Sequence, residues 1–362
     1  MGEPHGIGIV GLGVISATYL DTLQRHRDVR IVATADLDHA RATAVAASIP
    51  GCRARTVAEL VADPAVQTVL NLTIPAAHAE VALAAIAHGK NVYGEKPLAA
   101  TLAHARRMLA AADGSWVGGA PDTVLGTGVQ TARDAIDAGR IGRPLSAVAT
   151  WVSPGHEAWH PHPDFYYRDG GGPLFDMGPY YLTTLVQLLG PVVRVSGASS
   201  RPRSTRRIGS GPRVGEVIPV EVDTHVSGVL EHAGGVLATV TFSFDAAATT
   251  AAPIEVHGEA GTLAVPDPNL FDGAVRLRRL DDHEWTALPP TAGYEQAGRG
   301  IGLIDFLRDG GRRTHGAIAL HVLEIMTALL DSARDGVRIT LETTVERPPL
   351  VPLTPYEHWS RQ

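Results

Sequence analysis

Short apolar runs alternate with alanine-rich segments of helical spacing along residues 1–122. The runs predict strands, and the segments between them predict helices. Strands that alternate with helices form βαβ units, and their right-handed crossovers build a parallel sheet. The expected strands are residues 5–10, 31–35, 68–73, 91–93 and 115–119, and the expected helices are 40–48, 78–88 and 102–112. Residues 1–122 are therefore predicted to form a doubly wound α/β domain.

The pattern changes after Arg143, where strand-like runs follow one another with short turns. This succession favours a large, mainly antiparallel open sheet in a second α/β domain, residues 123–362. The expected strands are 146–152, 192–199, 217–222, 225–231, 236–244, 254–258 and 275–280, and the expected helices are 174–189 and 318–333.

The composition narrows the class of protein. With 362 residues, 44% of them hydrophobic, the chain is long enough for two well-buried cores. A net charge of −7 argues against nucleic acid or an anionic membrane as the main partner, because both need basic surface. Cys52 is the only cysteine, which favours a reducing compartment. No signal pattern is visible, and no apolar run reaches the roughly 18 residues of a membrane helix. A cytoplasmic protein is predicted.

A glycine-rich motif after the first predicted strand indicates a dinucleotide site. It opens a helical pattern, which is the context that such a motif needs. The first glycine permits a tight turn, the second lets the backbone approach a pyrophosphate, and the helix N-terminus offers N–H groups to the phosphates. The motif reads Gly11-Leu12-Gly13-Val14-Ile15-Ser16, with the small Ser16 in place of a third glycine.

Asp36 ends the second predicted strand, 20 residues beyond Ser16. A carboxylate there can accept hydrogen bonds from the adenosine ribose. Neither Leu37 nor Asp38 offers a cation to a 2′-phosphate, so NAD(H) is predicted rather than NADP(H). The alternative is a glycine turn in a Rossmann-like domain that binds something else or nothing.

Two further segments follow predicted strands at the sheet edge where doubly wound sheets bind their ligands. Taken alone, residues 73–78 would be a proline turn with a capping histidine, and residues 95–97 would carry an ordinary surface lysine. A lysine fixed by a proline at this edge is less ordinary. The segments are Thr73-Ile74-Pro75-Ala76-Ala77-His78 and Glu95-Lys96-Pro97.

The ordered set of motifs resembles the Gfo/Idh/MocA oxidoreductase family over residues 5–190. Besides the glycine motif, Asp36 and the 73–78 segment, it includes Gly-Lys-x-Val-x-x-Glu-Lys-Pro at 89–97 and Gly-Gly-Gly-x-Leu-x-Asp-x-Gly at 170–178. The resemblance implies an N-terminal Rossmann domain and a C-terminal α/β domain whose open sheet forms a homodimer or homotetramer interface. It also implies a nicotinamide cofactor and a sugar, polyol or related substrate.

The resemblance also implies roles for single residues. The family lysine corresponds to Lys96 and the family aspartate to Asp176, whereas Tyr180 stands where many members carry histidine. Glucose–fructose oxidoreductase and the dimeric dihydrodiol dehydrogenases look similar, with tyrosine in this position. Ala120-Pro121-Asp122 replaces a common Asn-x-Arg pattern, so the substrates of members with that pattern do not carry over. The implied cofactor-binding residues are Gly11, Gly13, Val14, Ile15, Asp36, Thr73, Pro75, His78, Glu95 and Lys96.

The chemistry of alcohol oxidation fits three of these side chains. The reaction removes a hydride to the nicotinamide and a proton to a base. Tyrosine needs a neighbouring cation to favour its phenolate, and Lys96 would supply that charge and polarise the carbonyl oxygen. Asp176 and Tyr180 are four residues apart and share a helix face, while Tyr181 points elsewhere. Without a cofactor signature, Asp176 would be a helix cap and Tyr180 a packed ring.

The segment after the first strand of the second domain contains a misleading motif. His156-Glu157-Ala158-Trp159-His160 matches the zinc-protease pattern, but the flanking prolines leave room for about one helical turn, so no metal site is predicted. Trp159 and His160 are instead expected in a loop that contacts a sugar, with plain packing of Trp159 as the alternative.

An arginine-rich stretch, residues 201–215, is expected to be a solvated loop. Recognition of an anionic substrate by arginine forks is the sharper alternative. The arginines are Arg201, Arg203, Arg206, Arg207 and Arg213.

The sequence thus predicts an NAD(H)-dependent dehydrogenase or reductase that acts on a hydroxyl or keto carbon of a sugar, glycoside or cyclic polyol. The expected substrate-binding residues are Lys96, Trp159, His160, Asp176 and Tyr180. A non-catalytic sensor or scaffold of the same fold, or a zinc hydrolase built on His156 and His160, are the alternatives.

Overall fold

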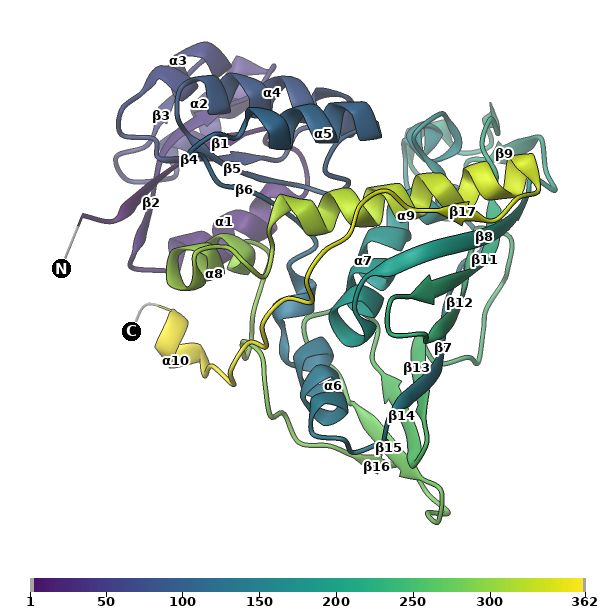
Figure 1. Cartoon of the computed structure of the whole chain (residues 1–362). Helices are drawn as coiled ribbons and strands as arrows, with labels where there is room; N and C mark the ends of the chain where they lie inside the picture. Colours follow the sequence, from purple (N-terminus) through teal and green to yellow (C-terminus); the bar gives the residue numbers. More distant parts are fainter. Residues whose placement is uncertain (1–2, 361–362) are drawn as a thin grey trace. The chain divides into compact units, whose positions relative to one another are not determined.

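A computed structural model describes residues 3–360. The chain divides into two compact units, each described here by itself (Figure 1). The first runs through Thr127 and includes Ala292–Leu323 and the segment from Pro348 onward, while the second comprises Gly128–Thr291 and Glu324–Arg347. The expected second domain, 123–362, therefore differs from the observed unit, because the chain returns twice to the first unit.

The first unit contains a six-stranded parallel sheet in the order β3-β2-β1-β4-β5-β6. The order reverses at β1, which lies between β2 and β4, and helices cover both sides of the sheet (Figure 1). The elements are β1 (His5–Val10), α1 (Ser16–Gln24), β2 (Val29–Ala35), α2 (His39–Ala47), β3 (Arg53–Ala54), α3 (Val57–Ala62), β4 (Thr68–Asn71), α4 (Pro75–Ala87), β5 (Asn91–Gly94), α5 (Leu102–Ala111) and β6 (Val117–Gly119). The prediction of a doubly wound parallel sheet is confirmed.

Buried polar contacts fix the segments that return to the first unit. Asp122 accepts hydrogen bonds from the backbone N–H groups of Gly300 (2.7 Å) and Gly302 (3.2 Å), at the start of helix α8 (Ile301–Asp309). A carboxylate is favourable at a helix N-terminus. Asp122, which the sequence singles out only as a departure from the family pattern, is thus a helix cap.

An arginine holds the last part of the chain in the same unit. Arg313 donates to the buried carboxylate of Asp305 at 2.6 Å and to the carbonyl oxygens of Pro349 and Leu350, each at 3.2 Å. This places the segment that ends in α10 (Tyr356–Trp359) beside α8 in the first unit.

The second unit is built on a nine-stranded sheet in the order β16-β15-β14-β13-β7-β12-β11-β8-β17. Neighbouring strands are antiparallel except β7 and β12, which are parallel, so the prediction of a mainly antiparallel open sheet is confirmed. The strands are β7 (Pro144–Val152), β8 (Val192–Ser200), β11 (His225–His232), β12 (Leu237–Ser243), β13 (Ile254–Gly258), β14 (Gly261–Val265), β15 (Arg276–Arg279), β16 (Thr286–Ala287) and β17 (Ile339–Thr340).

Helix α7 (Gly172–Leu189) covers the middle of this sheet and contacts β7, β11 and β12. Pro173 lies in its first turn and Pro179 in its interior. The expected helix is therefore present and starts before Pro173. Helix α6 (Thr127–Asp137) also belongs to this unit, whereas the long α9 (Gly316–Asp335) begins in the first unit and ends in the second.

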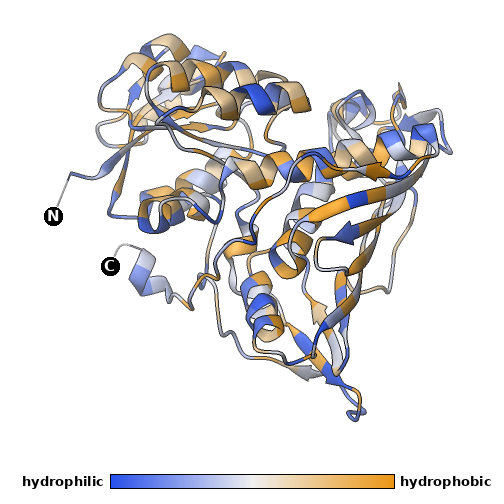
Figure 2. Ribbon diagram, in the orientation of Figure 1, coloured by the Kyte–Doolittle hydropathy of each residue, from blue (hydrophilic) through white to orange (hydrophobic). Residues whose placement is uncertain are grey.

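Helix α9 corrects one expectation. Among the described residues, α9 is long and apolar enough to cross a membrane, although no such segment was expected. Its apolar window is 67% buried, and Figure 2 shows polar residues mixed with apolar ones along it. A helix that packs one face into the core of a folded protein can have the same length and composition.

The expected loop of residues 201–215 contains a strand. β9 (Thr205–Arg207) pairs antiparallel with β10 (Val217–Pro219) in a separate two-stranded sheet. Ile208 and Ile218 lie in a buried cluster with Tyr167 and Phe244, so this hairpin has its own small core.

Candidate active site

The glycine turn after β1 has the backbone shape that a bound pyrophosphate requires. Gly11 has a φ of 91°, and a Cβ there would come within 2.7 Å of the Leu72 carbonyl group. A Cβ at Gly13 would instead meet open space, so this peptide faces an accessible region. Helix α1 begins at Ser16, whose hydroxyl donates to the Gly13 carbonyl oxygen at 2.7 Å. The turn therefore presents a helix N-terminus to the outside.

Asp36 joins this turn to the end of β2. Its carboxylate accepts hydrogen bonds from the N–H groups of Leu12 (2.7 Å) and Asp38 (2.8 Å). The guanidinium of Arg41, on α2, lies 3.3 Å from the same carboxylate. Neither Leu37 nor Asp38 carries a cation, and the cation that lies here, Arg41, is one helical turn further on and was not predicted.

The carboxyl edge of the parallel sheet carries three exposed apolar side chains. Val14 in the glycine turn, Leu37 after β2 and Ile74 after β4 are all strongly exposed. Large apolar side chains in such positions favour contact with a ligand that has flat apolar faces. Together with the Gly11 turn and Asp36, they fit a dinucleotide with an adenosine and a nicotinamide ring.

Asp36→Ala is expected to narrow the preference for NAD(H) over NADP(H). The substitution removes the ribose acceptor and leaves Arg41 paired only with Asp38 at 3.5 Å, so that its guanidinium can turn to a 2′-phosphate. Titration of both cofactors into the unmodified and variant proteins measures the change. Asp36→Ala combined with Arg41→Ala is the control, and it should lose the gain for NADP(H). Equal affinity of the unmodified protein for both cofactors would contradict this role of Asp36.

His78 supports the sheet edge from inside. It is 1% exposed, with Nδ1 2.8 Å from the Pro97 carbonyl oxygen and Nε2 3.0 Å from that of Thr73. Burial lowers the pKa of His78, and its ring joins the two segments. Because so little of the His78 surface is exposed, its main observed part is to hold the two segments, and its contact with the cofactor stays a prediction. Pro75 is the first residue of α4.

Lys96 follows β5 at the same edge. Its backbone N–H donates to the Glu95 carboxylate at 2.9 Å, and this carboxylate also accepts the Tyr19 hydroxyl at 2.7 Å. Glu95 is buried and Lys96 is half-buried. The Glu95 side chain thus holds the backbone of Lys96, and any contact of Glu95 with the cofactor is left to its main chain.

Helix α7 carries the other expected catalytic residues. Asp176 is partly exposed, and Tyr180, one turn further along, is buried. Tyr181 donates to Asp267 at 3.3 Å, and burial raises the pKa of its hydroxyl. Tyr181 therefore points away from Asp176, as expected.

The structure brings a histidine to Asp176 that the sequence reasoning did not assign. Nε2 of His156 lies 2.7 Å from Oδ2 of Asp176. His156 begins a 3-10 turn, His156–Ala158, and three residues separate this turn from the end of β7. It was considered only as part of the zinc motif. The one sequence signal for a second imidazole at Asp176 was the tyrosine at position 180, where many family members carry histidine.

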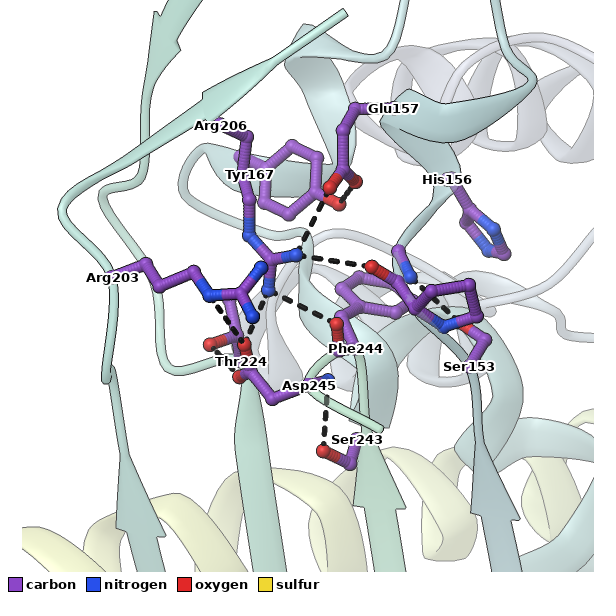
Figure 3. Close-up of polar contacts among 12 residues, drawn as sticks. Ser153, His156, Glu157, Tyr167, Arg203, Arg206, Thr224, Ser243, Phe244 and Asp245 are labelled. Carbon is purple, nitrogen blue, oxygen red and sulfur yellow. Dashed lines mark hydrogen bonds and ion pairs between the residues drawn. The ribbon is translucent and has the colours of Figure 1, made fainter. Parts of the chain in front are cut away.

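Glu157, next to His156, belongs to a buried ionic cluster (Figure 3). Arg206 on β9 is 3% exposed and donates to Glu157 at 2.9 Å and to Asp245 at 2.5 Å. It also donates to the carbonyl oxygens of Pro154 and Phe244. The Tyr167 hydroxyl donates to Glu157, and burial raises its pKa. Arg206 therefore joins the β9–β10 hairpin to the segment that carries His156.

Arg206→Met is expected to lower the free energy of unfolding by about 3–5 kcal/mol, because it leaves the buried Glu157 carboxylate without its cation and leaves Asp245 only the exposed Arg203 at 3.9 Å. Urea unfolding followed by circular dichroism measures this loss. The matched control is Arg207→Met, whose guanidinium is exposed and donates to the Gly215 carbonyl oxygen. A surface change of this kind should stay within about 0.5 kcal/mol. Similar losses in both variants would contradict a special role for Arg206.

The remaining arginines of the 201–215 stretch also have partners inside the second unit. Arg213 pairs with Asp164 at 2.5 Å and with Glu216 at 2.7 Å. Arg203 lies 3.9 Å from Asp245, and Arg201 donates to the Val220 carbonyl oxygen. The expectation of a solvated loop is therefore wrong for Arg206, which is buried, and Arg203, Arg206 and Arg213 pair with the protein's own carboxylates.

Trp159 and His160 occupy the same segment as His156. Trp159 is 59% exposed, and its indole N–H donates to Nδ1 of His156 at 3.2 Å. The His160 ring contacts Phe165 and Tyr166 edge-on. Within residues 3–360 no group of three or more His, Cys, Asp or Glu side chains was found that could hold a metal ion.

Comparison with known proteins agrees with these features. A family model described as an oxidoreductase family with an NAD-binding Rossmann fold matches residues 5–117, and the Gfo/Idh/MocA C-terminal domain model matches residues 129–264. The chain is 30% identical to a 1,5-anhydro-D-fructose reductase of Ensifer adhaerens over 307 residues, or 80% of this chain and 85% of the relative. It is 30% identical to an inositol 2-dehydrogenase of Ralstonia nicotianae over 287 residues, covering 76% and 77% of the two chains.

A solved NAD-binding oxidoreductase of Klebsiella pneumoniae has the same fold, with a TM-score of 0.80 at 23% identity over 93% of this chain and 99% of its own. The chain therefore belongs to the Gfo/Idh/MocA family of oxidoreductases, whose Rossmann domain binds NAD(H) as cofactor.

Proposed function

We propose that this enzyme transfers a hydride between NAD(H) and a hydroxyl or keto carbon of a sugar, glycoside or cyclic polyol. The observation that supports it most is the position of Lys96. This lysine lies at the carboxyl end of β5, in the sheet whose Gly11 turn and Asp36 fit the dinucleotide. Hydride transfer needs both cofactor-binding residues and a cation at this sheet edge, whereas a sensor needs only the cofactor-binding residues.

Each side chain has a defined part in oxidation. NAD⁺, which the Gly11 turn and Asp36 would hold, would supply the acceptor for the hydride of the alcohol C–H bond. The hydroxyl proton leaves to the Tyr180 phenolate, and the electron pair of the O–H bond forms the new C=O bond. Lys96 stabilises the negative charge on the reacting oxygen, an effect of preorganised charge. Asp176 orients the substrate hydroxyl, and reduction reverses these steps.

The polar and aromatic side chains of α7 and of the segment that carries His156 support this substrate class. Trp159 offers an exposed ring for the apolar face of a sugar, and His160 and Asp176 offer hydrogen-bonding groups. The names of the relatives point to an anhydro-sugar and to inositol. Both are polyhydroxylated rings, which supports the same class here.

A turnover screen tests the proposal. Sugars, glycosides and cyclitols are incubated with NAD⁺, and their keto forms with NADH, while the nicotinamide absorbance is followed. We expect at least one polyhydroxylated ring to be turned over. Binding of NAD(H) with no turnover across the screen would favour the sensor or scaffold instead.

The assembly and the location are also proposed. Val148, Val229 and Leu237 are exposed on the face of the nine-stranded sheet opposite α7. In adjoining strands Thr239 pairs with both Val148 and Val229, so these residues form a contiguous strip. Such a face suits a homodimer or homotetramer, and the single cysteine, Cys52, suits the reducing cytoplasm. Light scattering of the purified protein gives the mass, and a monomer at working concentration would contradict this assembly.

A further inference from the structure

The direction of the hydrogen bonds around His156 follows from the chemistry of its neighbours. The indole nitrogen of Trp159 can only donate, so the Nδ1 atom that it approaches at 3.2 Å must accept. In the neutral imidazole the hydrogen then lies on Nε2. Nε2 is 2.7 Å from Oδ2 of Asp176 and therefore donates to this carboxylate. The three side chains form a chain with one direction, from Trp159 through His156 to Asp176.

Packing holds the imidazole in this orientation. The ring centroid of His156 lies 4.4 Å from that of Tyr166 and 4.8 Å from that of Phe244. The Trp159 ring contacts it at 5.2 Å with the planes 70° apart. Rings on several sides leave the imidazole little freedom to flip or to leave Asp176.

The backbone of His156 is fixed as well. The adjacent Glu157 is bound by Arg206 and Tyr167, and its carbonyl oxygen accepts the Gly209 N–H at 2.7 Å. The residue before the turn, Gly155, has a φ of 108°, and a Cβ there would meet the Glu157 carboxylate. The ionic cluster of Figure 3 thus anchors the turn from which the imidazole reaches Asp176.

We propose that His156 is a positioning residue for Asp176 and that Trp159 fixes the tautomer in which it acts. A hydrogen bond from Nε2–H favours the ionised carboxylate and fixes the rotation of the Asp176 side chain. The position of its other oxygen, Oδ1, is then fixed as well. Tyr180 occupies the family's usual histidine position, and the imidazole at Asp176 comes instead from the segment after β7. This proposal rests on the proposed function, since it assigns Asp176 a part in turnover.

The first test compares three variants of the full chain with the substrate found in the screen. His156→Phe keeps a ring and deletes the donor, and kcat should fall by about 10- to 100-fold, as when an outer partner that orients a metal ligand is removed. His156→Gln keeps an N–H donor of similar reach and should recover most of this loss. NAD⁺ affinity, measured by titration, should not change in either variant. Asp176→Asn serves as the reference.

The second test reads the tautomer without turnover. Nitrogen NMR of protein labelled at histidine, with the His156 signal assigned by its loss in His156→Gln, should show hydrogen on Nε2 only. Trp159→Phe keeps a ring but deletes the indole donor, and it should introduce the other tautomer. Hydrogen on Nδ1 in the unmodified protein, or no change in Trp159→Phe, would overturn the assigned direction, even if His156→Phe failed to fold.

The outcomes separate this inference from the proposed function. If Asp176→Asn is inactive and folded His156→Phe keeps normal kcat, the positioning role is wrong and the proposed function stands. If His156→Gln is as slow as His156→Phe, the donor is not what matters and the positioning role is again wrong. If Asp176→Asn has normal turnover, both the assigned part of Asp176 in the reaction and the positioning role fall.

Discussion

Tyr180→Phe is expected to lower turnover by about 10²–10⁴-fold, the usual weight of general acid–base catalysis. The substitution keeps the buried ring and deletes only the hydroxyl that takes the substrate proton in the proposed mechanism. Cofactor affinity should change little, because Tyr180 lies on α7 and the dinucleotide residues lie in the other unit. Steady-state kinetics and NAD⁺ titration of the two proteins measure both quantities.

Tyr181→Phe is the matched control, since it removes the same group from the next residue. Its hydroxyl bonds to Asp267, so its loss should have a much smaller effect on turnover. Suppose instead that Tyr180→Phe is nearly silent while Asp176→Asn or His160→Ala removes the pH-dependent limb of the rate. The proton would then be handled by that residue, and Tyr180 would be a packed ring.

Lys96→Ala is expected to lower turnover by about 10²–10³-fold, the cost of removing one preorganised electrostatic group. The reacting oxygen loses its charge partner, while the Gly11 turn that holds the pyrophosphate is unaffected. Kinetics with the identified substrate, together with cofactor titration, should therefore show a loss of rate at nearly normal NAD⁺ binding.

The chain offers an unusually clean control, because Lys90 is its only other lysine. The Lys90 ammonium donates to the Asp63 carbonyl oxygen at 2.9 Å and has no part in the proposed site. Lys90→Ala should keep normal kcat. Near-normal turnover in Lys96→Ala would end the proposed mechanism.

The features that the sequence predicted are those with local signals. The glycine turn directly follows the first strand and Asp36 directly follows the second, so each is marked by a strand with a local pattern. Helix α7 was predictable because its apolar pattern persists over many residues, in spite of Pro179. The expected strand at 254–258 matches β13 to the residue for the same reason, since its pattern is local.

The features that the sequence did not predict depend on contacts between distant residues. His156 meets Asp176 across 20 positions, and Arg206 meets Glu157 across 49. An arginine in a stretch rich in arginine, glycine and proline suggests a solvated loop, because burial needs carboxylates from elsewhere in the chain. Those carboxylates, Glu157 and Asp245, carry no local mark of this role. The same holds for Asp122, because the helix that it caps, α8, begins at Ile301.

Direct detection of the transferred hydrogen tests the central claim. A substrate from the screen is labelled with deuterium at the carbon that carries the reacting hydroxyl and incubated with the enzyme and NAD⁺. We expect mass spectrometry to find the deuterium in NADH. Lys96→Ala should form far less deuterated NADH than the unmodified enzyme, and Lys90→Ala should form the normal amount. NADH formed without deuterium, or equal transfer in Lys96→Ala and the unmodified enzyme, would contradict the central claim.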